Sequence, residues 1–421
     1  MTYMARRGLL TGAAGALAAA ATAGTPAAAA ARPGTGAAPA ATRRAGEGPE
    51  FRGMWLATVA NLDWPSRAGL SAQQQYRELV AYLDTAVRRR LNAVILQVRP
   101  TADAFWPSEY EPWSASLTGT QGRDPGWDPL GTAVLEARSR GLELHAWFNP
   151  YRVANHTDPG RLASWHPARV HPEWTVEYGG RLYYNPGLPE VRAFVQEAML
   201  DAVARYPLDA VHWDDYFYPY PTAGAYFDDD AAYAAYGGSF DSRGDWRRDN
   251  VDTLVREMSE AVARVRPGTR FGISPFGVWR TKDRDPLGSP GGPALCSYDD
   301  LYADTRLWIR RGWLDYVVPQ VYWHIGNTGA DYAKLVPWWA GAVKGTRTDL
   351  YIGEALYRAD AQSPTPAWRK EGELSAHLTL AARHAEVRGH VYFSGKQVAA
   401  DRIGAMGRVV RDHYPTAVPP R

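Results

Sequence analysis

The sequence contains a single cysteine, Cys296, among its 421 residues, so no disulfide can form within one chain. It also has no GxGxxG, no P-loop, no CxxC and no HExxH motif. These absences give no support to a dinucleotide-binding fold, a nucleotide phosphate site or a zincin-type metal site. We therefore expect no cofactor.

Long apolar runs are also missing. The one candidate is the Ala-rich stretch near the N-terminus, and it is too weakly apolar for a membrane anchor, which needs about 20 strongly apolar residues. Net charge is small, at +2, and residues 1–44 carry five arginines and no acid. Removing that segment changes the net charge to −3, so a nucleic acid is not an expected partner.

The N-terminus has the pattern of an export signal. Arg6 and Arg7 precede a weakly hydrophobic run to about Ala31, with small residues at its end. This predicts a twin-arginine signal peptide over residues 1–31. Residues 32–50, rich in Ala, Gly, Pro and Thr, predict a disordered linker. We expect the mature protein, residues 51–421, to be soluble and either extracellular or associated with the cell envelope.

From residue 51 onward, short apolar segments alternate with amphipathic ones. Eight such repeats over the mature chain predict an α/β fold, a (β/α)8 TIM barrel with long βα loops. A doubly wound open sheet is the alternative, which the absence of a Gly-rich phosphate loop disfavours. The predicted strands are Gly53–Val59, Ala93–Val98, Glu143–Phe148, Ala210–Trp213, Phe271–Ser274, Tyr316–Gln320, Leu350–Gly353 and His390–Phe393. The predicted helices are Ala72–Arg89, Leu130–Arg140, Pro189–Tyr206, Arg247–Val265, Asp299–Arg311, Tyr332–Val343, Glu373–Glu386 and Ala399–His413.

The loops that follow the predicted strands are much longer than those that precede them, and they are rich in Trp, Tyr, Pro and Gly. In a barrel all of them rise on the C-terminal face, where active sites lie. The chain holds 17 Trp and 24 Tyr against 10 Phe. Trp and Tyr combine an apolar face with a polar edge, which suits stacking on sugar rings, although many must also pack the core.

The most informative segment is the predicted fourth strand, which ends in the adjacent carboxylates Asp214 and Asp215 before an aromatic loop. Desolvated carboxylates are costly without a partner or a function. Because His212 and Asp214 share a face, Asp214 is our first candidate for a catalytic carboxylate. The alternative is a structural pair held by backbone N–H groups or a neighbouring arginine.

Glycoside hydrolysis usually needs a second carboxyl group. Glu354 ends the predicted seventh strand, across the barrel, and Asp103 follows the second. Each has a structural alternative: a salt bridge between Glu354 and Arg358, and a loop-bracing role for Asp103.

Other strand ends supply candidates for substrate binding. Arg99 would bind carboxylates or hydroxyls, and His145 and His212 would orient or transfer protons. Aromatic side chains there are candidate sugar platforms, of which about half should prove to be packing. These aromatic candidates are Trp147, Trp213, Tyr216, Tyr218, Tyr322 and Trp323. The full set of predicted binding residues is Arg99, His145, Trp147, Asn149, Asn185, His212, Tyr216, Gln320, Tyr322 and Trp323.

Several segments taken together resemble the bacterial glycosyl-hydrolase-like family 10, from about Phe51 to Pro415. They are Phe51–Val59 with Asp63-Trp64-Pro65, Gln97–Pro100 with Asp103-Ala104, Trp147–Arg152, Asn185-Pro186-Gly187 and His212–Pro219. The resemblance implies a (β/α)8 barrel, export to the cell envelope and activity on glycan strands, for some members peptidoglycan glycan without stem peptides. It also implies that Asp214 and Asp215 are the family's paired acids, and that Arg99, Asp103, Asn149 and Asn185 are its other polar positions.

We therefore expect an exported glycoside hydrolase acting on a cell-envelope polysaccharide, with peptidoglycan glycan strands as the expected substrate. One alternative is a metal-dependent polysaccharide deacetylase or hydrolase, in which His145, His212 and His324 join the acids around a divalent cation. The other is a carbohydrate-binding barrel without catalysis.

Overall fold

The computed structural model describes residues 48–292 and 295–421. The chain divides into two units, residues 1–42 and 43–421. The predicted signal peptide and nearly all of the predicted linker lie outside the described residues. The barrel and the candidate site belong to the second unit.

Eight parallel strands close into a barrel in the order β1-β11-β10-β9-β8-β7-β3-β2. The predicted (β/α)8 fold is confirmed by this closure and by the helices between the strands. The barrel strands are β1 (Phe51–Leu56), β2 (Ala93–Arg99), β3 (Glu143–Phe148), β7 (Ala210–Trp213), β8 (Arg270–Ile273), β9 (Tyr316–Val317), β10 (Asp349–Glu354) and β11 (Val387–Phe393).

Alternate residues of each strand face the barrel interior. On β2, Ala93 and Ile95 join Trp55 and Tyr316 in a small interior cluster, whereas Val94 and Leu96 belong to the large core between strands and helices. The same alternation directs strand-end side chains such as Gln97 toward the open end of the barrel.

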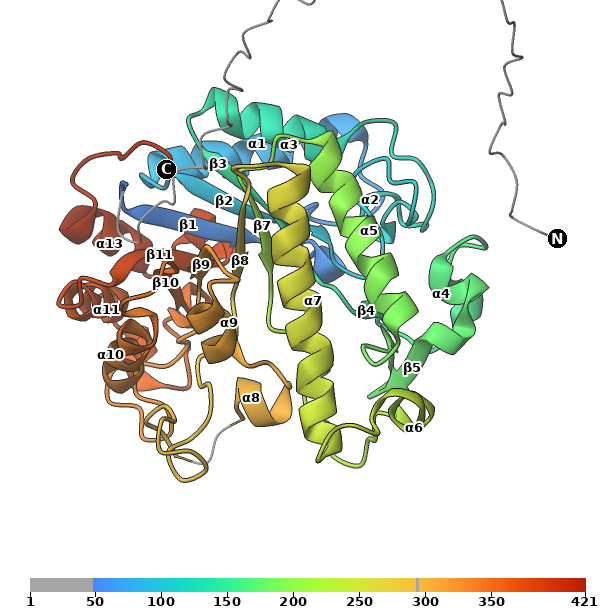
Figure 1. Cartoon of the computed structure of the whole chain (residues 1–421). Coiled ribbons are helices and arrows are strands. Elements are labelled where there is room, and N and C mark those ends of the chain that lie inside the picture. The colour runs from blue at the N-terminus through green and yellow to red at the C-terminus, as the bar shows by residue number, and fades with distance from the viewer. Residues whose placement is uncertain (1–47, 293–294) are drawn as a thin grey trace, which may run out of the picture. The chain divides into compact units, whose positions relative to one another are not determined.

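Figure 1 shows the long helices α1, α3, α5 and α7 packed around the strands. Local sequence explains their starts: Ser71 forms a capping box with Gln74, and Asp128 caps a helix that opens with Pro129. The helices are α1 (Ala72–Arg88), α2 (Ala115–Thr118), α3 (Pro129–Ser139), α4 (Pro167–Val170), α5 (Pro189–Arg205), α6 (Asp230–Tyr236), α7 (Arg243–Val265), α8 (Ser297–Asp300), α9 (Thr305–Arg311), α10 (Tyr332–Val343), α11 (Glu373–Ala381), α12 (Gly395–Ala400) and α13 (Ala405–His413). None of the helices within 48–292 and 295–421 is both long and apolar enough to cross a membrane.

Two predicted helices are each divided in two. The segment 299–311 is split between α8 and α9, because Tyr302 takes a left-handed φ of 53° and Asp304 caps a new helix. The segment 399–413 is split between α12 and α13, where Asp401 has a φ of 41°. In both places a left-handed residue interrupts a helical pattern that the sequence alone makes appear continuous.

The longest βα loop, between β3 and α5, builds a small antiparallel sheet with the order β4-β6-β5. Its strands are β4 (Arg152–Ala154), β5 (Thr175–Tyr178) and β6 (Arg181–Tyr184). In Figure 1, α6 and α8 lie at the lower end of the barrel, in the loops that follow β7 and β8. These loops wall the end of the barrel where the strands terminate.

Candidate active site

A cavity of about 370 Å³ opens at the C-terminal end of the barrel. Its floor comes from the last inward residues of β1, β2 and β3, and its walls come from the segments that follow β7, β8, β9 and β10. Six predicted site residues line it: Trp147, Asp214, Asp215, Tyr216, Gln320 and Tyr322. The other lining residues are Trp55, Ala57, Val59, Leu62, Gln97, Arg152, Tyr220, Ser274, Tyr357 and Phe393.

Asp214 is surrounded by hydrogen-bond donors. The Trp147 indole N–H donates to its Oδ2 at 3.0 Å, and the Asn149 amide donates to its Oδ1 at 3.0 Å. The backbone N–H of Tyr216 donates to Oδ1 at 3.1 Å. Burial raises the pKa of Asp214 above its ordinary value, and the charge of Arg152 and these donors reduce that rise. Each of the three donors stabilises the ionised carboxylate against the effect of burial.

Asp215 lies in a different environment. Burial and the charge of Asp214 together raise its pKa to about 6, against hydrogen bonds from Tyr220 and Gln320. The Tyr220 hydroxyl donates to Asp215 Oδ2. Two adjacent carboxyls in one cavity therefore have different surroundings, the kind of arrangement that can separate an acid from an ionised partner.

Glu354 does not line this cavity. Its side chain is fully buried and accepts hydrogen bonds from the Tyr332 hydroxyl at 2.7 Å, from His377 Nδ1 at 2.8 Å and from His390 Nδ1 at 3.0 Å. Burial alone would raise the pKa of Glu354, but the two histidines lower it to about 2. The structure therefore does not bring Glu354 together with Asp214: its hydrogen bonds join it to α10, α11 and β11. Its partners also differ from Arg358, the one considered from the sequence.

Asp103 also lies outside the cavity of the acid pair. It accepts hydrogen bonds from the backbone and hydroxyl of Thr101 at 3.4 and 3.2 Å, and burial raises its pKa to about 7. It lines a neighbouring cavity of about 620 Å³, which Ala60 and Val153 also line. Asp103 therefore hydrogen-bonds within its own loop and is not brought together with Asp214 or Asp215.

Three predicted binding residues, Arg99, Asn149 and Asn185, make hydrogen bonds to other parts of the chain and do not line the cavity. Arg99 is fully buried in an ion pair with Glu111 at 2.5 Å, and its guanidinium donates to the carbonyls of Asn149 and Pro150. Asn149 positions Asp214, and its Oδ1 accepts the backbone N–H of Arg152 at 2.7 Å. Asn185 accepts the backbone N–H of Gly187 at 2.9 Å and so forms the turn before α5. These three residues make contacts within the chain and are not among the residues that line the cavity.

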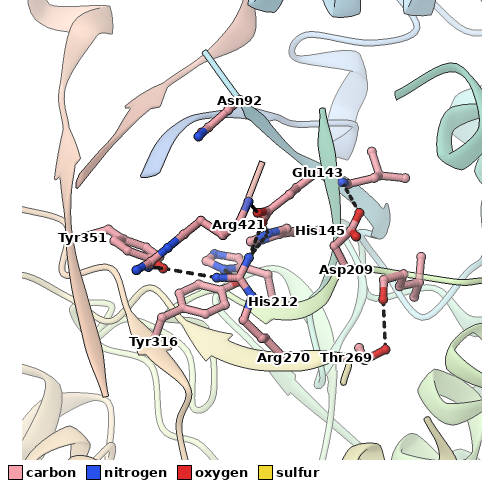
Figure 2. A network of polar contacts seen from close by, with 12 residues as sticks. Asn92, Glu143, His145, Asp209, His212, Thr269, Arg270, Tyr316, Tyr351 and Arg421 are labelled. Atoms are coloured by element: carbon pink, nitrogen blue, oxygen red, sulfur yellow. Dashed lines mark hydrogen bonds and ion pairs between the residues drawn. The ribbon is translucent and has the colours of Figure 1, made fainter. Parts of the chain in front are cut away.

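His212 and His145 belong to a polar chain inside the barrel (Figure 2). The Trp55 indole donates to His212 Nε2 at 3.1 Å, so the proton of this neutral imidazole lies on Nδ1, 3.1 Å from the Tyr316 hydroxyl. Tyr316 in turn lies 2.9 Å from His145 Nδ1, and His145 Nε2 lies 2.9 Å from Glu143.

Burial lowers the pKa of both histidines. Their ring nitrogens are all occupied, so these two residues orient Trp55 and the barrel interior and do not face the cavity.

Some of the aromatic side chains that we considered as sugar platforms line the cavity, and others pack within the protein. Trp147, Tyr216 and Tyr322 line the cavity, whereas Trp213 and Tyr218 are buried in the core. Trp323 packs edge-on against Phe276, with ring centroids 5.5 Å apart, and is absent from the cavity lining.

Among the lining residues that the sequence patterns did not assign to the site are Trp55, Arg152 and Tyr220. Trp55 could have been found from strand alternation, since it shares the inward face of β1 with Phe51. Arg152 and Tyr220 lie in long loops, whose course no periodic pattern reveals.

Within 48–292 and 295–421, no group of three or more His, Cys, Asp or Glu side chains is placed to hold a metal ion. His324 Nδ1 lies 2.8 Å from the Ile325 carbonyl, and the nitrogens of His145 and His212 are engaged inside the barrel. The three histidines of the metal-dependent alternative are therefore not gathered around the acid pair.

The sequence matches the family described as Glycosyl hydrolase-like 10 over residues 50–370. It is 47% identical over 374 residues to the glycosyl hydrolase YngK of Bacillus subtilis (strain 168), covering 88% of this chain and 73% of that protein. It is 41% identical over 373 residues to the glycosyl hydrolase DigH of Escherichia coli (strain K12), covering 84% of each chain. The chain belongs to this family, and the resemblance read from its motifs is confirmed.

Solved structures with the same fold include the PgaB (BpsB) glycoside hydrolase domain from Bordetella bronchiseptica. The TM-score is 0.54 at 13% identity, with 86% of this chain and 98% of that one covered. The catalytic domain of β-amylase from Paenibacillus polymyxa gives 0.52 at 11% identity, covering 88% and 99%. At these identities the similarity shows the barrel fold alone. Family and fold together support a glycosidase-type enzyme with a polysaccharide substrate.

Proposed function

We propose that this member of glycosyl hydrolase-like family 10 is an exported glycoside hydrolase that cleaves peptidoglycan glycan strands lacking stem peptides. The observation that carries the proposal is the acid pair Asp214 and Asp215, held in unequal environments within one aromatic-walled cavity. Aromatic walls suit sugar rings, and unequal carboxyls suit acid-assisted cleavage of a glycosidic bond. Export rests on the arginine pair and Ala-rich run at the N-terminus.

The unequal environments assign the roles. Asp215, with a pKa raised to about 6, is the proton donor to the leaving oxygen. Asp214, surrounded by donors and near Arg152, is the ionised carboxylate that stabilises the positive charge developing on the sugar. Tyr220 holds Asp215 in place through its hydrogen bond.

Among residues 48–292 and 295–421, no carboxylate from the opposite side of the barrel lines the cavity, whose acidic lining residues are Asp214 and Asp215. Sugars of peptidoglycan carry a 2-acetamido group, and in some glycosidase families that group of the substrate acts as the nucleophile. In this proposal the acetamido oxygen attacks the anomeric carbon as the glycosidic C–O bond breaks and Asp215 protonates the leaving oxygen, while Asp214 accepts a hydrogen bond from the acetamido N–H. Water, whose proton passes to Asp215, then attacks the anomeric carbon and opens the cyclic intermediate. Such a route retains the anomeric configuration.

The test is digestion of purified peptidoglycan, with and without stem peptides, followed by mass spectrometry and NMR of the products. We expect new reducing ends from the stem-peptide-free strands, released in the retained configuration. If the only product is acetate, or if activity is lost with EDTA and restored by zinc, the protein is a metal-dependent deacetylase or hydrolase. If the strands bind and no bond is cleaved, it is a carbohydrate-binding barrel.

A further inference from the structure

Arg152 is a buried arginine without an anionic partner. It begins β4 and is 8% exposed, and it lines the cavity that holds the acid pair. Within residues 48–292 and 295–421, its guanidinium makes no hydrogen bond or ion pair. By contrast, the buried guanidinium groups of Arg99, Arg247 and Arg270 are paired with Glu111, Asp229 and Glu143. Arg152 is therefore the exception that requires an explanation.

The surroundings of Arg152 hold the cation but leave its donors free. The guanidinium carbon lies 4.2 Å from the centroid of the Tyr216 ring, so one face of the guanidinium is stacked on an aromatic face. Its charge acts on Asp214 through space and lowers the pKa of that carboxyl, with no ion pair between the two. A stacked guanidinium presents its N–H groups at the edge, in the fork that matches a carboxylate.

Desolvating a cation is costly unless an anion compensates for it. In this cavity the natural compensation is a negative group on the bound substrate. The position fits, because Arg152 shares the lining with Asp214 and Trp147, where the sugar that undergoes cleavage has to lie.

We propose that Arg152 is a specificity-determining residue that binds a carboxylate carried by the sugar next to the acid pair. This inference rests on the proposed function. In stem-peptide-free strands each muramic acid carries a free lactyl carboxylate, whereas in intact peptidoglycan that carboxyl is an amide and has no charge to offer. A uronic acid would present the same chemistry. Arg152 thus gives a physical reason for a preference for strands without stem peptides.

The experiment compares two glycans and two proteins. Stem-peptide-free strands are used as isolated, and again after reduction of their carboxyl groups to alcohols. Wild-type enzyme should show a kcat/KM about 10- to 100-fold higher on the carboxylate form, the range of hydrogen bonds to charged groups. Arg152→Gln should lose most of this preference, which is measured as the ratio of its kcat/KM values on the two glycans.

A role limited to supporting Asp214 gives a different pattern, because Arg152→Gln would then lower kcat/KM equally on both glycans, and this would overturn the inference. Wild-type enzyme that cleaves both glycans equally would overturn it as well, without use of the variant, and would leave the proposed function standing. Cleavage of neither glycan would overturn the proposed function and the inference together.

Two controls complete the design. Arg256→Gln, on α7, should retain the wild-type preference, since its side chain is 42% exposed. Oligomers of a uronic acid distinguish the source of the carboxylate: we expect no cleavage of them, and cleavage at the rate of muramic acid strands would contradict the assignment to the lactyl group.

Discussion

Two buried carboxyl sites lie at strand ends of one barrel and differ in character: Glu354 is the last residue of β10, and the pair Asp214 and Asp215 follows β7. Glu354 is fully paired with Tyr332, His377 and His390, and its pKa is lowered to about 2. Asp215 opens to a cavity beside another carboxylate, and its pKa is raised to about 6. Burial is common to both sites, so it does not identify a reactive group. What distinguishes them is that Glu354 is enclosed by its three hydrogen-bond donors, whereas Asp214 and Asp215 line a cavity beside each other.

The largest expected effect is on catalysis by the acid pair that lines the cavity, Asp214 and Asp215. Asp214→Asn and Asp215→Asn should each lower kcat on glycan strands by about 10²- to 10⁴-fold, the usual contribution of an acid or base group. Asp215→Asn should regain activity on an aryl glycoside, whose leaving group needs no proton, whereas Asp214→Asn should not.

Steady-state kinetics on both substrates check this assignment. Asp228→Asn, an exposed acid of the same loop, should retain wild-type rates. Recovery of Asp214→Asn alone on the aryl glycoside would exchange the two roles.

A substitution of Glu354 should lower the stability of the fold and leave catalysis unchanged. Glu354→Gln leaves His377 without its buried anion and should lower the free energy of unfolding by about 3–5 kcal/mol. The exposed Glu371→Gln, paired with Arg408 at 3.2 Å, should cost at most about 1 kcal/mol. Urea denaturation measures both changes, and an unchanged stability of Glu354→Gln would remove the basis of the comparison.

The same site sets a pH dependence of stability. Because the folded pKa of Glu354 lies below its ordinary value of 4.5, its contribution is present above that pH and is lost as pH falls toward 2. The free energy of unfolding of Glu354→Gln should therefore fall less steeply than that of wild type in this window.

A smaller effect on stability is expected for Tyr316, whose hydroxyl lies inside the barrel. Tyr316→Phe removes the hydroxyl that joins His212 to His145 and leaves a buried N–H of His212 unsatisfied, at a cost of about 1–3 kcal/mol. Thermal unfolding measures this cost. The exposed hydroxyl of Tyr178 provides the matched control, and Tyr178→Phe should change stability by less than about 0.5 kcal/mol. Equal effects of the two changes would show that burial of the Tyr316 hydroxyl adds nothing to its contribution.

The smallest effect is a shift in pH dependence. Activity should fall at high pH as Asp215 loses its proton near pH 6. The hydrogen bond from Tyr220 lowers the pKa of Asp215, so Tyr220→Phe should move this limb to higher pH. Profiles of kcat/KM measure the limb, with Tyr357→Phe as a cavity-lining control whose limb should not move. A shift to lower pH in Tyr220→Phe would contradict the assignment of Asp215 as proton donor.

Periodicity predicted most of the fold, because strand alternation and helical spacing are local properties. The acid pair could be predicted for the same reason: Asp214 and Asp215 directly follow an apolar strand, and the barrel places every strand end on one rim. The division of the last helical pattern at Asp401 could not, since a single left-handed residue leaves hydrophobic spacing intact.

The role of Glu354 could not be predicted, because its partners His377 and His390 come from segments distant in sequence. Arg152 and Tyr220 were missed for a related reason. Each stands in a loop, and the closure of the barrel alone brings both beside the acid pair.

The acid pair Asp214 and Asp215, which lines the cavity, should cleave the glycan, and the enclosed carboxylate Glu354 should take no part in cleavage. This difference is measured most directly by the release of reducing ends from stem-peptide-free strands by wild type, Asp215→Asn and Glu354→Gln, each compared per folded molecule. We expect release by wild type and by Glu354→Gln, and loss of release by Asp215→Asn. Release by Asp215→Asn together with none by folded Glu354→Gln would contradict the assignment of both sites.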